Sequence, residues 1–259
     1  MIRIVQIEQR FAEDLERLQR DCFPNLAEHE LMTRENFISH CRIFPEGDFV
    51  ALDVSERSPV DGQTADGQTA DGQTADGQTA DEQPAGHPGN SVPTNAGAAE
   101  RVVGLGSGFF TEFDFDHPDH TFEEVIAGGD YSNHDPDGDW YYGGDISVHP
   151  DYRRRGIGRM LYDARKDLVR RFNRRGIVAG GALPGYAEQR DSLTVPDYVR
   201  KVVGGGLNDP TLSFQLRNGF RVRGMLRDYI EDSVTGNWAT LIAWENPAYR
   251  ASQGVGARR

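Results

Sequence analysis

Lysine, cysteine and long apolar runs are scarce in this sequence of 259 residues. Only Lys166 and Lys201 are lysines among the 28 basic residues, so arginine supplies nearly all of the positive charge. The two cysteines, Cys22 and Cys41, are too far apart for a C-x-x-C pair, and we expect free thiols in a reducing cytoplasm. No apolar run approaches a membrane span, and the N-terminus lacks the apolar core of a signal peptide. These absences predict a soluble, cytoplasmic protein that does not enter membranes.

The composition is strongly acidic, with a formal net charge of -13 and 37% hydrophobic residues. An acidic surface with almost no lysine predicts a halophilic protein, because high salt screens self-repulsion while carboxylates stay hydrated. A GC-rich genome that prefers arginine codons is the alternative. Diffuse acidity argues against non-specific binding to nucleic acids or anionic lipids.

A low-complexity insertion divides the chain. The unit DGQTA occurs four times over residues 61–80, and residues 55–100 contain almost no large apolar side chain. Such a segment cannot bury enough surface to offset chain entropy, so we predict a disordered surface loop there. Residues 1–54 and 101–247 are expected to form one domain, followed by a flexible tail at 248–259.

Hydrophobic spacing outside the insertion predicts an α/β fold. The order of elements indicates a mixed central sheet of about seven strands flanked by helices, with the insertion at the tip of a hairpin. Strands are predicted near 2–7, 48–54, 101–110, 140–148, 176–181, 220–230 and 238–244, and helices near 11–22, 32–44, 157–172 and 210–217.

The stretch HPDYRRRGIGRML, at residues 149–161, concentrates positive charge in this acidic chain. It connects a predicted strand to an amphipathic helix, where the first N–H groups lack acceptors and the helix dipole is positive. Gly156 and Gly158 would let an anion approach the main chain, and Arg153–Arg155 supply charge and forked donors. The spacing R-x-x-G-x-G is neither a dinucleotide fingerprint nor a P-loop. It indicates a phosphate-binding turn, with an ordinary charged helix start as the alternative.

The segment DISVHPDYRRRGIGRMLYDARKDL resembles the central motif of the GNAT acetyltransferase superfamily, which is a strand, R/Q-x-x-G-x-G/A and a helix. The order of elements resembles that fold as well. The segments GDWYYGGDISVHPDYR, GGALPGY and DPTLSFQLRNGF are also similar to the GNAT domain that accompanies nitrilase-type hydrolase domains. We expect a stand-alone GNAT domain, because too little chain follows the last strand for a nitrilase site.

The resemblance implies acetyl-CoA as acyl-donor co-substrate, held between two strands that splay apart. Turn amides would hold its pyrophosphate, and main-chain groups of the preceding strand would pair with the pantetheine and polarise the thioester carbonyl. One further residue falls in register with the family's late-helix pattern N-x-x-A-x-x-x-Y-x-x-x-G-F. The implied cofactor-binding residues are Ile146, Ser147, Val148, Arg153, Arg154, Arg155, Gly156, Ile157, Gly158, Arg159 and Asn208.

Direct acetyl transfer to an amine requires a base that keeps the amine neutral. Asp145, beside the implied carbonyl-binding residues, is the first candidate, and a purely structural hydrogen bond is its alternative role. Glu112 and Asp114, at the end of the preceding strand, are the next candidates.

The departing thiolate also requires a proton donor. The family's tyrosine position holds Gln215, and a glutamine cannot protonate a thiolate at useful pH. Either water supplies the proton or another tyrosine does, with Tyr142, Tyr186 and Tyr229 as the candidates.

Two other polar clusters carry weaker signals. Asp135, Asp137 and Asp139 alternate as in a calcium loop, but Trp and Ile stand where that loop needs Gly and Glu, so no metal is expected. His117 and His120 lie among acidic residues without a helical metal-binding frame, and we expect a solvated or substrate-side loop.

The sequence therefore predicts an acetyl-CoA-dependent N-acetyltransferase acting on a primary amine of a small molecule, peptide or protein. A catalytically silent acyl-CoA-binding module is the alternative, motivated by Gln215. Nucleic-acid binding through the arginine triplet is a remote third hypothesis, and the expected partners exclude nucleic acid. The expected partners are acetyl-CoA and an amine acceptor, with a homodimer left open.

Overall fold

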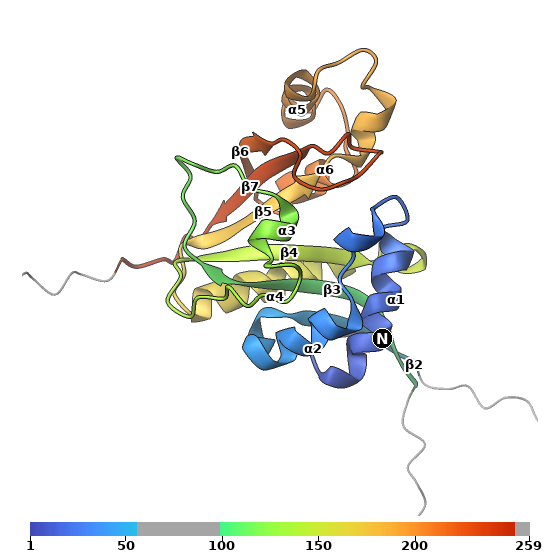
Figure 1. Cartoon of the computed structure of the whole chain (residues 1–259), viewed down its shortest axis with the longest axis vertical. Coiled ribbons are helices and arrows are strands. Elements are labelled where there is room, and N and C mark those ends of the chain that lie inside the picture. Colours follow the sequence, from blue (N-terminus) through green and yellow to red (C-terminus); the bar gives the residue numbers. More distant parts are fainter. Residues whose placement is uncertain (56–98, 252–259) are drawn as a thin grey trace, which may run out of the picture.

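The computed structural model describes residues 1–55 and 99–251, which form a seven-stranded sheet with helices on both faces (Figure 1). The strand order is β1-β2-β3-β4-β5-β7-β6, and every neighbouring pair is antiparallel except β4 with β5, which is parallel. This confirms the predicted α/β fold. The strands are β1 Ile2–Gln6, β2 Phe49–Ser55, β3 Ala99–Thr111, β4 Trp140–Val148, β5 Gly176–Ala182, β6 Arg221–Leu226 and β7 Ala239–Glu245.

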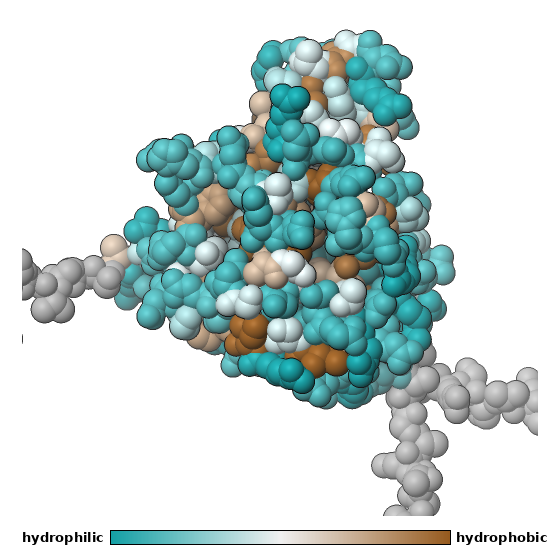
Figure 2. Space-filling view, in the orientation of Figure 1, coloured by the Kyte–Doolittle hydropathy of each residue, from teal (hydrophilic) through white to brown (hydrophobic). Residues whose placement is uncertain are grey.

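Helices cover the sheet in two layers. The α-helices are α1 Ala12–Cys22, α2 Arg34–Ile43, α3 Phe122–Val125, α4 Ile157–Arg171, α5 Val195–Val203 and α6 Leu212–Arg217. Figure 1 shows α1 and α2 on one face and α4 on the other. Glycines of β3 admit α4 closely, because a side chain at Gly104 or Gly106 would press on Ile157, Leu161 or Arg165. In Figure 2 the surface on the α1 side is mostly hydrophilic, with scattered apolar patches.

The β4–β5 pair is the irregular point of the sheet. Its register runs only from Trp140 opposite Gly176 to Tyr142 opposite Val178. Beyond that point β4 continues along β3 and β5 continues along β7, so the facing edges of β4 and β5 diverge. Gly144 is an extra residue between the β3 partners Ser107 and Gly108, and such a bulge bends a strand. The predicted splayed strand pair is therefore confirmed.

The structure differs from the predicted elements mainly after β5. Helix α5 was missed, although Thr194 caps it and Pro196 lies in its first turn, both ordinary start signals. The strand predicted at 220–230 ends at Leu226, and Asp228 then has a positive φ of 51°. The α2 helix begins at Arg34, because the side chain of Thr33 accepts the N–H of Asn36 and caps it.

The predicted insertion at 55–100 and tail at 248–259 fall mostly outside the described residues. At the edges of the insertion, Ser55 pairs with Ala99 in β2 and β3, so both strands extend slightly into the predicted range. At the start of the tail, Arg250 N donates to Asn173 Oδ1 at 3.0 Å and Arg250 O accepts from Asn173 Nδ2 at 2.8 Å.

Replacing residues 56–98 by an Asn-Gly turn is expected to preserve the fold. The ends already lie in hairpin register, and a two-residue type I′ turn suits that geometry. A shorter loop costs less closure entropy, so the free energy of unfolding should rise by about 1–3 kcal/mol. Urea titration of both proteins measures this difference. A variant that no longer folds would show that the replaced segment stabilises the domain.

Candidate functional site

A cleft of about 590 Å³ opens where β4 and β5 diverge. Its walls come from β4 residues Gly143–Val148, from β5, from the end of α1 and from α4 and α6. The chain after β6 adds Tyr229 and Ile230. The cleft therefore follows the facing edges of β4 and β5, beyond the point where these two strands stop pairing with each other.

The arginine–glycine turn stands at the outer end of this cleft. Arg153 lines the cleft, and its Nε donates to the carbonyl of Val148 at 3.1 Å, which fixes the side chain beside the end of β4. Gly156 caps α4 with a φ of 84°, a left-handed conformation that favours glycine. No side chain caps this helix and its first turn has no acidic residue. The first N–H groups of α4 are thus available to an anion at its positive end.

The remaining turn residues lie around that helix start. Arg154 and Arg155 are exposed; Arg155 donates to the Asp151 carbonyl at 2.9 Å and lies over the Tyr152 ring. Arg159 is exposed and faces Asp163 at 3.8 Å. All three arginines of the triplet are thus exposed, and only Arg153 lines the cleft.

Asp145 is the carboxylate that the structure places inside the cleft. It is 8% exposed, and its Oδ2 accepts hydrogen bonds from Gln19 Nε2 at 2.8 Å and from Ser147 Oγ at 3.0 Å. Burial raises the pKa of Asp145 to about 6, against the opposing effects of the Gln19 hydrogen bond and the Arg165 charge. A carboxylate with this pKa is ionised at neutral pH and can accept a proton.

Polar groups that the sequence reasoning missed face Asp145 from the helices. Gln19 lies on the buried side of α1 and Arg165 on the buried side of α4, where the apolar spacing alone would have placed hydrophobic residues. Arg165 is 2% exposed; its Nη2 donates to the Ser107 carbonyl at 2.6 Å and its Nε has no partner. A polar residue inside a helix's apolar stripe is the signal that could have identified both.

Gln215 lines the cleft at the position where the family pattern has tyrosine. It is 3% exposed, and its Oε1 has no hydrogen-bond partner. Tyr162 also lines the cleft, and burial raises its pKa to about 12. Gln215 thus presents an amide to the cleft and no ionisable proton.

Two of the candidate tyrosines meet at the inner end of the cleft. Tyr229 lines the cleft, and its hydroxyl lies 3.0 Å from that of Tyr142. The Tyr142 hydroxyl lies 2.7 Å from His120 Nε2. Burial raises the pKa of Tyr142 well above 10 and lowers that of His120. The third candidate, Tyr186, is not in the cleft lining, and its hydroxyl donates to Leu193 O at 3.1 Å.

The structure does not bring the other predicted residues to the cleft. Glu112 and Asp114 are exposed beyond the end of β3, next to the start of β4; Glu112 accepts the N–H of Asp139 at 3.1 Å. Because β3 and β4 are antiparallel, the end of β3 lies beside Trp140 at the start of β4, several residues from Asp145. Asn208 is exposed, whereas the adjacent Asp209 is buried and accepts the N–H groups of Thr211 and Leu212 at the start of α6.

The cysteines do not offer a reactive thiol to the cleft. Both cysteines are free, and burial raises the pKa of Cys22, a cleft residue, to about 12, so its thiol is protonated and a poor nucleophile. Over residues 1–55 and 99–251, no group of three or more His, Cys, Asp or Glu is arranged to hold a metal ion. None of the helices in these ranges is long and apolar enough to cross a bilayer.

Asp145→Asn is expected to stabilise the protein at neutral pH. Because the folded-state pKa is raised from 3.8 to about 6, ionising Asp145 costs the folded state more than the unfolded chain, and stability falls as pH rises through that interval. The neutral amide avoids this cost, so the free energy of unfolding near pH 7 should rise by about 3 kcal/mol. Urea unfolding near pH 7 and near pH 4 checks this, since the gain should vanish at the lower pH. A less stable variant near pH 7 would mean that the carboxylate is net stabilising.

Curated relatives share most of this chain. It is 33% identical over 251 residues to "Probable hydrolase YhcX" of Bacillus subtilis, a match covering 96% of the chain but only 40% of YhcX. It is 30% identical over 241 residues to "Uncharacterized N-acetyltransferase YkwB" of the same organism, covering 92% of the chain and 87% of YkwB. The chain thus spans less than half of one relative and most of the other.

Solved structures share the fold. The GphF GNAT-like decarboxylase in complex with isobutyryl-CoA has a TM-score of 0.65 at 20% identity, covering 94% of this chain and 99% of that one. The loading GNATL domain of CurA from Lyngbya majuscula also has a TM-score of 0.65, at 14% identity, covering 95% and 98%. Residues 81–181 match the model of the acetyltransferase (GNAT) family. With the splayed β4–β5 pair and the similarity to YkwB, these matches show that the chain belongs to the GNAT acetyltransferase family.

Proposed function

We propose that this protein is an N-acetyltransferase that transfers an acetyl group from acetyl-CoA directly to a primary amine. One observation carries the proposal: a single cleft runs from Arg153, in the turn that precedes α4, to a buried carboxylate along unpaired strand edges. The first feature suits a pyrophosphate, the edges suit the amides of a pantetheine arm, and the carboxylate suits proton removal from an amine.

The residues present fit acetyl-CoA. The N–H groups at the start of α4 lack acceptors within the helix, and Arg153 adds charge beside them. The β4 edge from Ile146 to Val148 lines the cleft and has no β5 partner, so its main-chain groups can bind an extended arm. Arg154, Arg155, Ile157, Gly158 and Arg159 complete the proposed pyrophosphate turn.

Asp145 is the proposed base. Its Oδ2 is held by Gln19 and Ser147, which leaves Oδ1 outside these two hydrogen bonds. An ammonium that enters the cleft gives a proton to this carboxylate, and the neutral amine then attacks the thioester carbonyl. Polarisation of that carbonyl by a main-chain N–H of β4 stabilises the charge that develops on its oxygen. Because the Cys22 thiol is protonated, direct transfer is favoured over an acyl-cysteine intermediate.

A silent acyl-CoA-binding module is the second candidate function. Gln215 motivates it, since the amide at the family's tyrosine position offers no proton to a leaving thiolate. Binding of acetyl-CoA without thiol release across a broad amine panel would favour this function over acetyl transfer.

Arg153→Ala is expected to weaken acetyl-CoA binding. Loss of a charge-assisted contact at the pyrophosphate turn should raise Kd by about 10- to 100-fold, and less at high KCl because salt screens the charge. Arg171→Ala, at the opposite end of α4, is the matched control and should change Kd by no more than about twofold. Titration calorimetry at low and molar KCl measures both. Equal effects of the two substitutions would remove the turn from the binding site, and no binding by the unmodified protein would overturn the proposed function.

Asp145→Asn should abolish the acidic limb of the rate profile. The unmodified enzyme's kcat/KM for an amine should rise with pH through about 6 as Asp145 ionises. The variant should lose about 10²-fold or more in kcat, as expected for removal of a general base. Thiol release from acetyl-CoA, screened against polyamines, amino acids, aminoglycosides and peptide N-termini in high KCl, provides the assay. Asp167→Asn, an exposed carboxylate of α4, is the control, and an equal loss there would exclude a specific role for Asp145.

A further inference from the structure

A continuous hydrogen-bonded chain leads from the inner end of the cleft to a partly buried histidine. The Tyr229 and Tyr142 hydroxyls lie 3.0 Å apart, and the Tyr142 hydroxyl lies 2.7 Å from His120 Nε2. His120 Nδ1 lies 2.6 Å from the carbonyl of Pro118. Tyr229 is a wall of the cleft, so one end of this chain meets the space where substrates would react.

The direction of these hydrogen bonds follows from the Pro118 carbonyl. A carbonyl only accepts, so Nδ1 of His120 must carry a proton. In the neutral imidazole Nε2 is then an acceptor, and Tyr142 donates to it. The Tyr142 oxygen in turn accepts the proton of the Tyr229 hydroxyl. In this resting state the Tyr229 oxygen still has a lone pair for a proton from the cleft.

The hydrogen-bonded chain lies where β4 and β5 stop pairing, which is the closed end of the cleft. Tyr142 is the last β4 residue that pairs with β5. Gly180 lies two residues beyond the last β5 partner and packs against Tyr229. Glycine is required there, because a side chain at position 180 would overlap the Tyr229 ring. The two hydroxyls therefore stand where the diverging edges begin.

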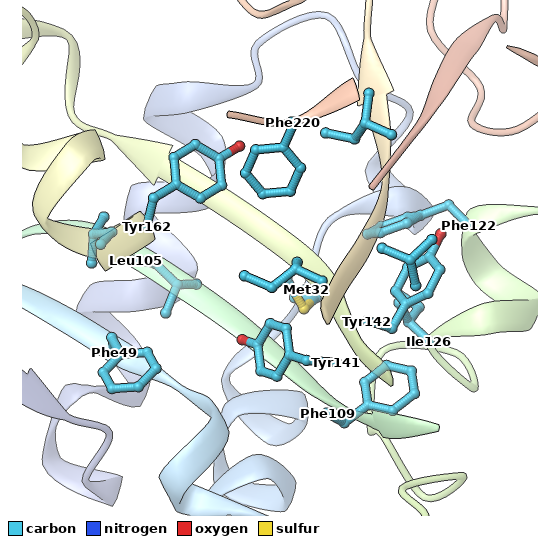
Figure 3. Packing of buried hydrophobic residues seen from close by; sticks show 14 of the residues in the cluster. Met32, Phe49, Leu105, Phe109, Phe122, Ile126, Tyr141, Tyr142, Tyr162 and Phe220 are labelled. Carbon is cyan, nitrogen blue, oxygen red and sulfur yellow. The ribbon is translucent and has the colours of Figure 1, made fainter. Parts of the chain in front are cut away.

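Aromatic packing holds the chain in place. Tyr142 lies against Phe109 and Phe113, with ring centroids 5.9 and 6.2 Å away, and the His120 ring lies edge-on to both tyrosines at 5.6 Å. Figure 3 shows Tyr142 directed towards Phe122 and Ile126, opposite to its neighbour Tyr141. A fixed arrangement is suited to proton transfer, because the surrounding rings hold the donor–acceptor distances.

We propose that Tyr229, Tyr142 and His120 shuttle the proton of acetyl transfer, which rests on the proposed N-acetyltransferase function. When the amine has attacked, its N–H proton moves to the Tyr229 oxygen, the Tyr229 proton moves to the Tyr142 oxygen, and the Tyr142 proton moves to His120 Nε2. When the C–S bond breaks, the same three transfers run in reverse, and the Tyr229 proton forms the S–H bond of CoA. His120 ends neutral, and no proton is gained or lost.

The charges around His120 suit a transient cation. Burial lowers its pKa and keeps the resting imidazole neutral, while Glu124 and Asp119 oppose that effect. Glu30 is the acidic group that acts on the Tyr229 end of the chain. The acidic neighbours favour an imidazolium formed during turnover, while burial favours the return of its proton. Such a shuttle supplies the proton that Gln215 cannot.

Tyr142→Phe interrupts the chain at its centre and keeps the ring. It should lower kcat for acetyl transfer by about 10²-fold, with the KM for acetyl-CoA nearly unchanged, as for loss of one acid–base step. Tyr141→Phe is the matched control: this neighbour is equally buried, and its hydroxyl donates to Gly47 O at 2.8 Å outside the chain. Thermal melts of both variants separate a loss of folding from a loss of rate. Equal kcat values in the two variants would overturn the shuttle, whereas an unmodified protein that binds acetyl-CoA but acetylates no amine would overturn the proposed function.

His120 provides two independent readouts. Nitrogen-15 NMR of the full-length protein should show the Nδ1–H tautomer for this ring at neutral pH, a measurement that needs no turnover. His120→Ala should lose a similar factor in kcat, and added imidazole should restore part of it, because His120 is only partly buried. The same imidazole should not rescue Tyr142→Phe, which lacks the next link. An Nε2–H tautomer, or a His120→Ala variant with unchanged kcat, would overturn the proposal.

Discussion

The early end of the β4–β5 ladder is the constraint on which the rest of the site depends. Only three residue pairs connect the two strands, although both continue beside other partners. Unpaired main-chain groups inside a protein are costly unless something binds them. In this protein the Tyr229 ring packs on Gly180 at the closed end, and the β4 edge from Ile146 to Val148 at the open end stays available to a substrate. The divergence of the two strands therefore creates the cleft, and side chains from the helices and loops complete its lining.

Charge is arranged locally against an overall excess of acid. The net charge is -13, yet the helix start that borders the cleft has no acidic residue in its first turn. Inside the sheet, the Arg165 guanidinium and the Asp145 carboxylate are both buried, and the arginine lowers the pKa that burial raises. The two opposing effects leave Asp145 with a pKa of about 6, close to neutrality, where a base works best. The Gln19 hydrogen bond lowers this pKa as well.

The fold could be predicted from the sequence wherever the apolar residues followed a clear strand or helix period. Residues 140–148 and 157–171 were placed almost to the residue, because alternating and helical patterns there are interrupted only by the turn between them. Helix α5 was missed because no strand lies between β5 and this helix to mark where a new element begins. Thr194 and Pro196 nevertheless mark its start. In the site, Asp145 was found by its place on β4. Gln19, Arg165 and His120 could not be placed, because their partners lie 126, 58 and 22 residues away.

The substitution of glutamine for tyrosine in α6 gains a physical meaning from these contacts. The Gln215 amide packs closely on Gly181, because a side chain at position 181 would overlap it. Gln215 fits as a narrow amide, and the phenols stand on the other side of β5, where Gly180 admits the Tyr229 ring. Consecutive strand residues point to opposite faces, so the two glycines separate an amide face from a phenol face. The proposed proton transfer therefore belongs to the face of β5 that carries the Tyr142 and Tyr229 hydroxyls, where His120 can hold a proton.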